Sequence, residues 1–192
     1  MEDRARWSCA ALAGLFVEVS ADPATGAALT PAIALVADAQ AEGETTAWVA
    51  AADGTFFPPD AAAAGVDLAA LVVVRLVGAQ AGAQAGGRAA DKLLRSGGFG
   101  LVVLDLGDGR GLPPPLQARL AGLVERHRAV LVCLTDKRAD AASLGAAVGL
   151  RVAARRARDG DRHVVSLTAQ KDRRGRAGWR WQEDAGAPAG LR

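Results

Sequence analysis

Residues 16–40, FVEVSADPATGAALTPAIALVADAQ, set the architecture that we expect for the whole chain. The run at Phe16–Val19 is aromatic and β-branched, which predicts a buried strand. A loop containing Pro and Gly follows at Ala21–Leu29, and an apolar helix is predicted at about Pro31–Gln40. A strand that runs through such a loop into a helix is the layout of a phosphate-binding loop.

The composition fits one medium-sized globular domain. The chain has 192 residues, of which 51% are hydrophobic and 23% charged, so a sizeable core is expected and wholesale disorder is not. No apolar run approaches the roughly 20 residues that cross a bilayer. We therefore expect no membrane partner and a cytoplasmic protein, with nucleoid association left open. We interpret the apolar start as the first core element and not as a signal peptide.

The rest of the chain alternates short apolar runs with segments of helical spacing. Strands are predicted at Ala47–Ala51, Leu71–Leu76, Leu101–Leu106, Ala129–Leu134, Leu150–Ala154, His163–Ala169 and Gly178–Gln182. Helices are predicted at Ala61–Ala64 with Asp60 as its cap, at Ala83–Arg95 and at Leu116–Arg126, and a loop with a short helix at Thr135–Ala147. This order predicts an α/β fold with a mostly parallel sheet and an antiparallel C-terminal extension. We assign residues 1–13 to a lead-in, 14–182 to one domain and 183–192 to a flexible tail.

Four segments in this order resemble the ATPase core of the RecA recombinases: VEVSADPATGAAL, AWVAAADGTFFPPDAAAAGVDLAAL, ADKLLRSGGFGLVVLDL and LVCLT. The resemblance spans about residues 14–182, and its most specific parts are GVDLAAL and RSGGFGLVVLDL. It implies a RecA-like, P-loop-type core. The short length and eroded loop are most similar to the RecA-like accessory proteins of ImuA type, which are associated with bacterial SOS-induced, error-prone translesion synthesis.

The resemblance also marks a degenerate phosphate loop, whose residues are Pro23, Ala24, Thr25, Gly26, Ala27, Ala28, Leu29 and Thr30. In the family this loop runs Gly-x-x-x-x-Gly-Lys-Thr/Ser. Depending on register, Ala28 or Ala27 stands in the lysine position, and Asp22 in the position of the first Gly brings a carboxylate toward a triphosphate. We therefore expect no cofactor, with ATP and magnesium as the open alternative. Thr30-Pro31 indicates either a cap and first helical residue, or a helix that begins near Ala27.

Two acids are candidate catalytic residues if any ATPase activity remains. By the resemblance, Asp53 or its neighbour Ala52 stands where the family has the glutamate that activates water, and Asp105 stands where an acid orients magnesium. Thr135 falls on a γ-phosphate-sensing position, but we interpret it as structural. We expect no metal site, because His127 and His163 are isolated. Cys9 and Cys133 are expected to be inert thiols in a reducing cytoplasm.

The C-terminal part is basic. Residues 151–192 carry 11 basic and 5 acidic side chains, whereas residues 1–150 carry 12 basic and 16 acidic ones. The candidate binding residues of this basic lobe are Arg155, Arg156, Lys171, Arg173, Arg174 and Arg176. With Trp179 and Trp181 they could bind single-stranded nucleic acid, or an acidic protein. The alternative is a solvated hairpin whose indoles cover the end of the sheet.

The favoured prediction is a non-catalytic RecA-like accessory protein of SOS-induced translesion DNA synthesis. By the resemblance it would contact an error-prone DNA polymerase or the accessory subunit of that polymerase, with RecA and DNA as further partners left open. Three alternatives remain: a residual ATP-binding or ATPase RecA paralogue in DNA repair that uses Asp53 and Asp105, an SOS cell-division inhibitor that binds a tubulin-like protein, and a plain nucleic-acid binder.

Overall fold

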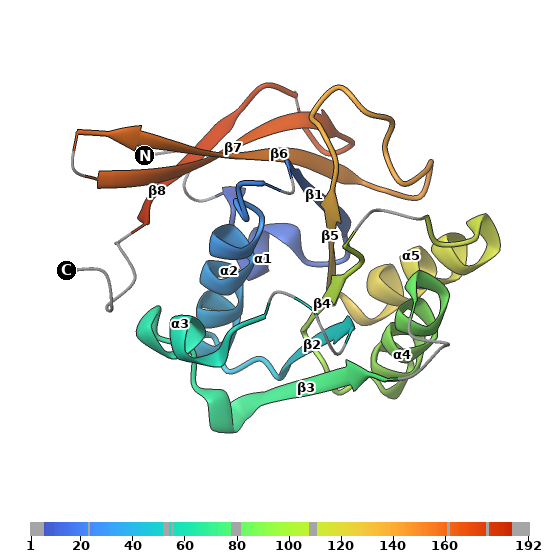
Figure 1. Ribbon diagram of the computed structural model, residues 1–192. Helices are drawn as coiled ribbons and strands as arrows, with labels where there is room; N and C mark the ends of the chain where they lie inside the picture. Colours follow the sequence, from blue (N-terminus) through green and yellow to red (C-terminus); the bar gives the residue numbers. More distant parts are fainter. Residues whose placement is uncertain are drawn as a thin grey trace.

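The chain folds around one sheet, seen in a computed structural model that describes residues 6–22, 24–51, 54, 56–77, 82–107, 111–160, 162–175 and 177–185 (Figure 1). The strands are β1 (Phe16–Ala21), β2 (Thr46–Ala51), β3 (Leu71–Leu76), β4 (Leu101–Asp105), β5 (Val130–Asp136), β6 (Leu150–Asp159), β7 (Arg162–Asp172) and β8 (Arg180–Ala185). The helices are α1 (Cys9–Leu12), α2 (Leu29–Ala41), α3 (Pro58–Ala63), α4 (Ala83–Ser96) and α5 (Pro114–His127), with a 3-10 turn, η2 (Leu68–Ala70).

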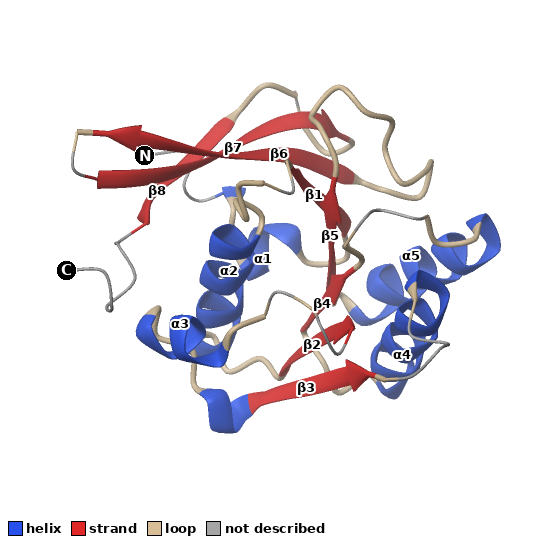
Figure 2. Ribbon diagram, viewed as in Figure 1, coloured by secondary structure: helices blue, strands red, loops and turns tan. Residues whose placement is uncertain are grey.

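The strand order across the sheet is β3-β2-β4-β5-β1-β6-β7-β8. The strands from β3 to β6 in this order are parallel, and β7 and β8 continue the sheet antiparallel, as Figure 2 shows in red. This confirms the predicted α/β fold with its antiparallel C-terminal extension. The carboxyl ends of β5 and β1 lie side by side, and β6 runs beyond them. Ligands of open α/β sheets bind at such an edge.

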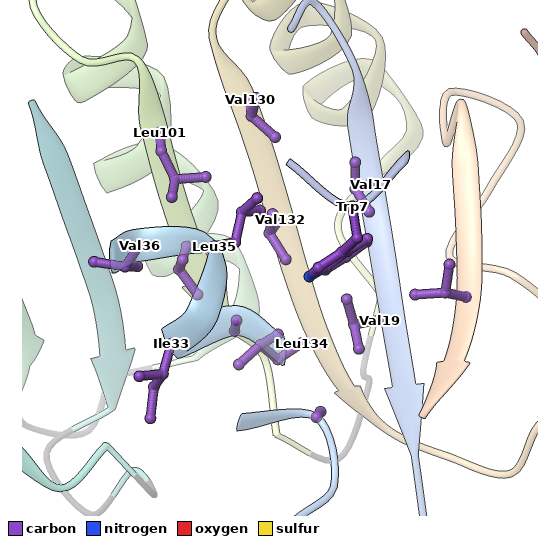
Figure 3. Close-up of a cluster of buried hydrophobic side chains, with 14 of the residues drawn as sticks. Trp7, Val17, Val19, Ile33, Leu35, Val36, Leu101, Val130, Val132 and Leu134 are labelled. Carbon is purple, nitrogen blue, oxygen red and sulfur yellow. The ribbon is translucent and has the colours of Figure 1, made fainter. Parts of the chain in front are cut away.

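Helices cover both faces of the sheet (Figure 1). Residues alternate along each strand, so Val17 and Val19 of β1 face α2 while Phe16 faces the side of α4 and α5. Figure 3 shows the first core, in which Trp7 from the N-terminal segment packs near Val17, Val19 and Val132. Cys133 is fully buried in the second core, which fits its interpretation as an inert thiol.

Helix α2 begins earlier than its Thr-Pro pair suggests. It starts at Leu29 with Ala28 as the cap residue, so Pro31 lies inside the first turn. The interpretation with Thr30 as the cap is therefore wrong, and the alternative start near Ala27 is confirmed. Pro31 is tolerated there because the first amides of a helix have no helical acceptor.

Prolines also begin two other helices. α3 starts at Pro58 and α5 at Pro114, both of which the sequence placed in loops. A proline ring fixes the backbone dihedral that the first helical turn needs, so these residues favour a helix start. The predicted cap of α3 is also wrong, because Phe57 occupies the cap position and Asp60 lies in the first turn.

Two further boundaries differ from the prediction. Among the described residues of 137–149 the chain forms turns and no helix, although a short helix was predicted at Thr135–Ala147. β8 runs to Ala185, so residues 183–185 of the predicted tail continue the sheet, and the other seven residues of that tail, 186–192, lie outside the described residues.

Candidate functional site

The loop between β1 and α2 stands at the position of a phosphate-binding loop, but several of its backbone amides already donate to acceptors within the loop. Ala24 N donates to the Asp22 carboxylate at 3.0 Å, and Thr25 N donates to the Asp22 carbonyl oxygen at 3.0 Å. Ala27 N donates to the Thr25 hydroxyl oxygen at 3.4 Å. Phosphate loops bind their ligand through free backbone amides, and these three already have acceptors.

The second half of this loop is closed in the same way. Leu29 N donates to the Gly26 carbonyl oxygen at 3.3 Å, which begins α2. Ala27 is fully buried and Ala28 is 7% exposed, so the two candidates for the lysine position face the core. Thr30 lies within the first turn of α2, and Pro23 lies outside the described residues.

No lysine from elsewhere replaces the missing one. The chain has only three lysines. Lys92 lies on α4, across the sheet from α2, and Lys137 places its Nζ 2.5 Å from Glu18 Oε1. Lys171 lies on β7, where burial and the nearby Arg173 lower the pKa of its ammonium. None of the three lines the cavity beside the loop.

That cavity, of about 580 Å³, opens at the carboxyl end of β1, beside the middle of β6. Its charged and hydroxyl-bearing residues are Ser20, Asp22, Thr25, Arg138, Asp140, Arg155 and Arg156. Three guanidinium groups favour an anionic ligand, whereas the Asp22 carboxylate opposes one. Arg138 Nε is also shared with Asp140 Oδ1 at 3.2 Å. The cavity thus joins part of the predicted loop to part of the predicted basic lobe.

The candidate catalytic acids do not form a complete site in the described chain. Asp105 ends β4, and its Oδ1 accepts a hydrogen bond from Gly107 N at 3.2 Å. Asp53 lies outside the described residues, so its prediction stays a prediction. Thr135 is buried, with its hydroxyl 3.3 Å from Glu18 Oε1, which agrees with a structural role. No group of three or more possible metal ligands occurs among the described residues.

Glu18 is the polar centre that sequence reasoning missed. Its side chain is fully buried on β1 and accepts hydrogen bonds from Ser143 Oγ at 2.7 Å and from Leu144 N at 2.9 Å. Lys137 Nζ lies at 2.5 Å and Arg151 Nε at 3.9 Å from its carboxylate oxygens. Burying a carboxylate is costly unless it is paired and hydrogen-bonded, and here both conditions hold.

The same network holds the chain between β5 and β6. The Arg151 guanidinium donates to the Ala141 carbonyl oxygen and lies 3.3 Å from the Ala139 oxygen. This explains why the segment forms turns and not a helix, because its carbonyls and its Leu144 amide are used by side chains of β1 and β6. A lone acid in an apolar strand was visible in the sequence, but its partners could be found only from the strand order β5-β1-β6.

The structure divides the predicted basic lobe between the middle and the open end of the β6–β7 hairpin. Arg155 and Arg156, in the middle of β6, line the cavity, whereas Lys171 lies opposite Arg151 at the open end. Five residues of strand, about 16 Å, separate Arg156 from Arg151. The lobe is therefore two separate patches rather than one surface.

The arginines of the far patch and both tryptophans have structural partners. Arg174 donates to the Ala13 carbonyl oxygen at 2.7 Å, and Arg173 donates to the carbonyl oxygen of Ala146. Trp179 and Trp181 are 8% and 5% exposed, so these indoles cover the sheet and offer no platform for stacked bases. Arg176 lies outside the described residues.

The thiols do not supply a nucleophile. Burial, with Glu42 and Glu44 nearby, raises the pKa of Cys9 to about 12, and burial next to Glu18 raises that of Cys133. Thiolates, which are the reactive form, are thus disfavoured at both positions. Within the described ranges, no helix has the length and apolar character to cross a bilayer.

Comparisons with known proteins bear on the fold. No protein-family model matches the chain, and no curated protein matches it. A similar solved structure is that of the flagellar accessory protein FlaH from Methanocaldococcus jannaschii, with a TM-score of 0.65 and 8% sequence identity, covering 90% of this chain and 87% of that one. At this identity the likeness concerns architecture alone, and it shows that the chain has a RecA-like core.

Proposed function

We propose that this protein is a non-catalytic RecA-like accessory factor that acts through contacts with other proteins. The RecA-like core supports the structural half of this proposal. The resemblance of the sequence to the ImuA-type proteins supports the biological half, a role in SOS-induced, error-prone translesion DNA synthesis with the polymerase or its accessory subunit as partner.

One observation carries the proposal: the phosphate loop is closed on itself. The Asp22 carboxylate occupies the Ala24 amide, and the Ala27 amide is occupied by Thr25. A triphosphate would have to break these hydrogen bonds, and it would gain no lysine and meet the charge of Asp22. Hydrolysis of ATP is disfavoured for the same reasons.

A free sheet edge supports a role in protein contacts. β3 is the last strand of the sheet, and Val72, Val73 and Val77 along it are 41%, 39% and 75% exposed. Exposed edge strands with apolar side chains can pair with a strand of another chain. Among the residues that the structure describes, no helix lies over this edge (Figure 1).

The proposal is tested by complementation of a deletion in the source organism. Deletion should abolish damage-induced mutagenesis, and an Asp105→Ala allele should restore it fully, because no ATP chemistry is required. A Val73→Lys allele should fail to restore it while producing folded protein, since lysine on an edge strand opposes strand pairing. Failure of the Asp105→Ala allele alone would contradict the non-catalytic role.

A second candidate function, residual nucleotide binding, is favoured by the three arginines in the cavity beside the loop. Arg138, Arg155 and Arg156 could contact phosphates in place of the lysine. This candidate requires magnesium-dependent binding of ATP that weakens when Arg155 is replaced by alanine. The non-catalytic proposal expects no such binding.

A further inference from the structure

A second concave surface lies between α4 and α5, across the sheet from α2 (Figure 1). This α4–α5 cleft encloses about 530 Å³. It is lined by Arg88, Asp91, Lys92, Arg95, Ser96, Leu116 and Arg119. Neither the phosphate loop nor the β3 edge contributes to it.

The cleft has a cationic surplus. Asp91, the acid among the described lining residues, is buried and forms ion pairs with two arginines. Arg95 Nη2 lies 2.5 Å from one carboxylate oxygen and Arg119 Nε lies 2.6 Å from the other, and we call this arrangement the Asp91 clamp. Arg88 and Lys92 are exposed and form no ion pair with any described residue. Both oxygens of the carboxylate are engaged, so the remaining positive charge is available to an anionic partner.

The floor of the cleft is apolar. A Cβ atom at Gly87 would lie 2.7 Å from Leu116 Cδ2, so the missing side chain lets Leu116 of α5 approach α4 closely. Leu116 is half-buried and lies among the cationic side chains, whose methylene stems add to the apolar surface. A complementary ligand therefore needs an aliphatic group as well as negative charge.

We propose that the α4–α5 cleft binds a short acidic peptide segment of a partner protein that carries an aliphatic side chain. The row formed by Arg88, Lys92 and Arg95 spans about 10 Å along the helix. That is the length of about three residues of extended peptide. Single-stranded nucleic acid needs about four or more nucleotides and aromatic platforms. Among the described residues, no aromatic side chain lines the cleft.

The experiment uses the full chain and a fluorescently labelled, capped peptide with two acidic residues on each side of a leucine. Anisotropy should show saturable binding that weakens as salt is raised, because exposed charges are screened. The same peptide with Asn and Gln in place of its acids should bind at least about tenfold more weakly. Oligothymidylate should not displace the acidic peptide.

Two double variants test whether the peptide binds in the cleft. Arg88→Glu combined with Lys92→Glu, neither of which disturbs the Asp91 clamp, should reduce affinity at least about tenfold. The matched control, Arg158→Glu with Arg180→Glu, makes the same charge change at exposed positions of β6 and β8 that line neither cavity, and it should change affinity less than about twofold. Circular dichroism checks that both variants are folded.

The inference would be overturned by absent binding of the acidic peptide, by equal binding of the amide peptide, or by unchanged binding after the change at Arg88 and Lys92. Displacement by oligothymidylate would assign the cleft to nucleic acid and would also overturn it. None of these results bears on the phosphate loop, so the proposed function and this inference fail separately.

Discussion

Glu18 shows at the scale of one residue how this chain uses buried charge. Its carboxylate has no exposed surface, and five groups from β5, β6 and the segment between them surround it: the Thr135 and Ser143 hydroxyls, the Leu144 amide, the Lys137 ammonium and the Arg151 guanidinium. Removing one partner of a buried pair is expensive because the other charge is left uncompensated. The network therefore contributes order to the 137–149 segment as well as stability.

We predict that Glu18→Gln lowers the free energy of unfolding by about 3 kcal/mol, since it leaves Lys137 and Arg151 without their carboxylate. Urea denaturation measures this. The matched control, Asp140→Asn, removes the 3.2 Å contact with Arg138. Both of those side chains are largely exposed, so this change should stay within about 0.5 kcal/mol. Equal losses of unfolding free energy in the two variants would contradict the role of Glu18 as a buried, paired carboxylate.

A double variant separates charge from packing. Lys137→Met added to Glu18→Gln removes the uncompensated ammonium and should recover part of the lost stability. A simple sum of two destabilising effects would instead indicate that the two side chains act independently.

At the scale of elements, α4 shows why helix propensity failed to predict packing. Gly86 and Gly87 disfavour helix in an isolated segment. In the fold, a Cβ at Gly86 would lie 2.8 Å from Leu104 Cδ1, and Leu104 is fully buried. Gly86 therefore lets α4 pack close to β4, and Gly87 lets it pack close to Leu116 of α5. Only the tertiary structure shows these contacts.

This contact predicts opposite effects for two identical changes. Gly86→Ala should destabilise the protein by about 1 kcal/mol, because overpacking outweighs the gain in helix propensity. Gly122→Ala in α5 meets no atom within 4 Å and should stabilise it by about 0.5–1 kcal/mol. Thermal unfolding of both variants measures the difference, and stabilisation by both would contradict the proposed packing of α4.

Element types followed from the sequence better than element boundaries. β3 lies at the predicted Leu71–Leu76, because its Val-rich run is typical of a strand and has clear ends. The starts of α3 and α5 were misplaced because proline favours both loops and first helical turns, and local sequence does not distinguish them.

At the scale of the whole molecule, the alternation of strands and helices was enough to predict a mostly parallel sheet with antiparallel final strands. The candidate site was less predictable, because it depends on which strands are neighbours. The basic lobe is contiguous in sequence but divided in space, since β7 returns antiparallel and carries Lys171 away from Arg155. The buried tryptophans could not be distinguished from exposed ones without that sheet.

In the phosphate loop, hydrogen bonds to the side chains of Asp22 and Thr25 occupy backbone amides that would otherwise be free to bind phosphate. Equilibrium dialysis of purified protein with labelled ATP and magnesium tests this most directly. The account predicts no saturable binding up to about 1 mM ATP, an affinity limit near 4 kcal/mol. Micromolar binding that requires magnesium would contradict it.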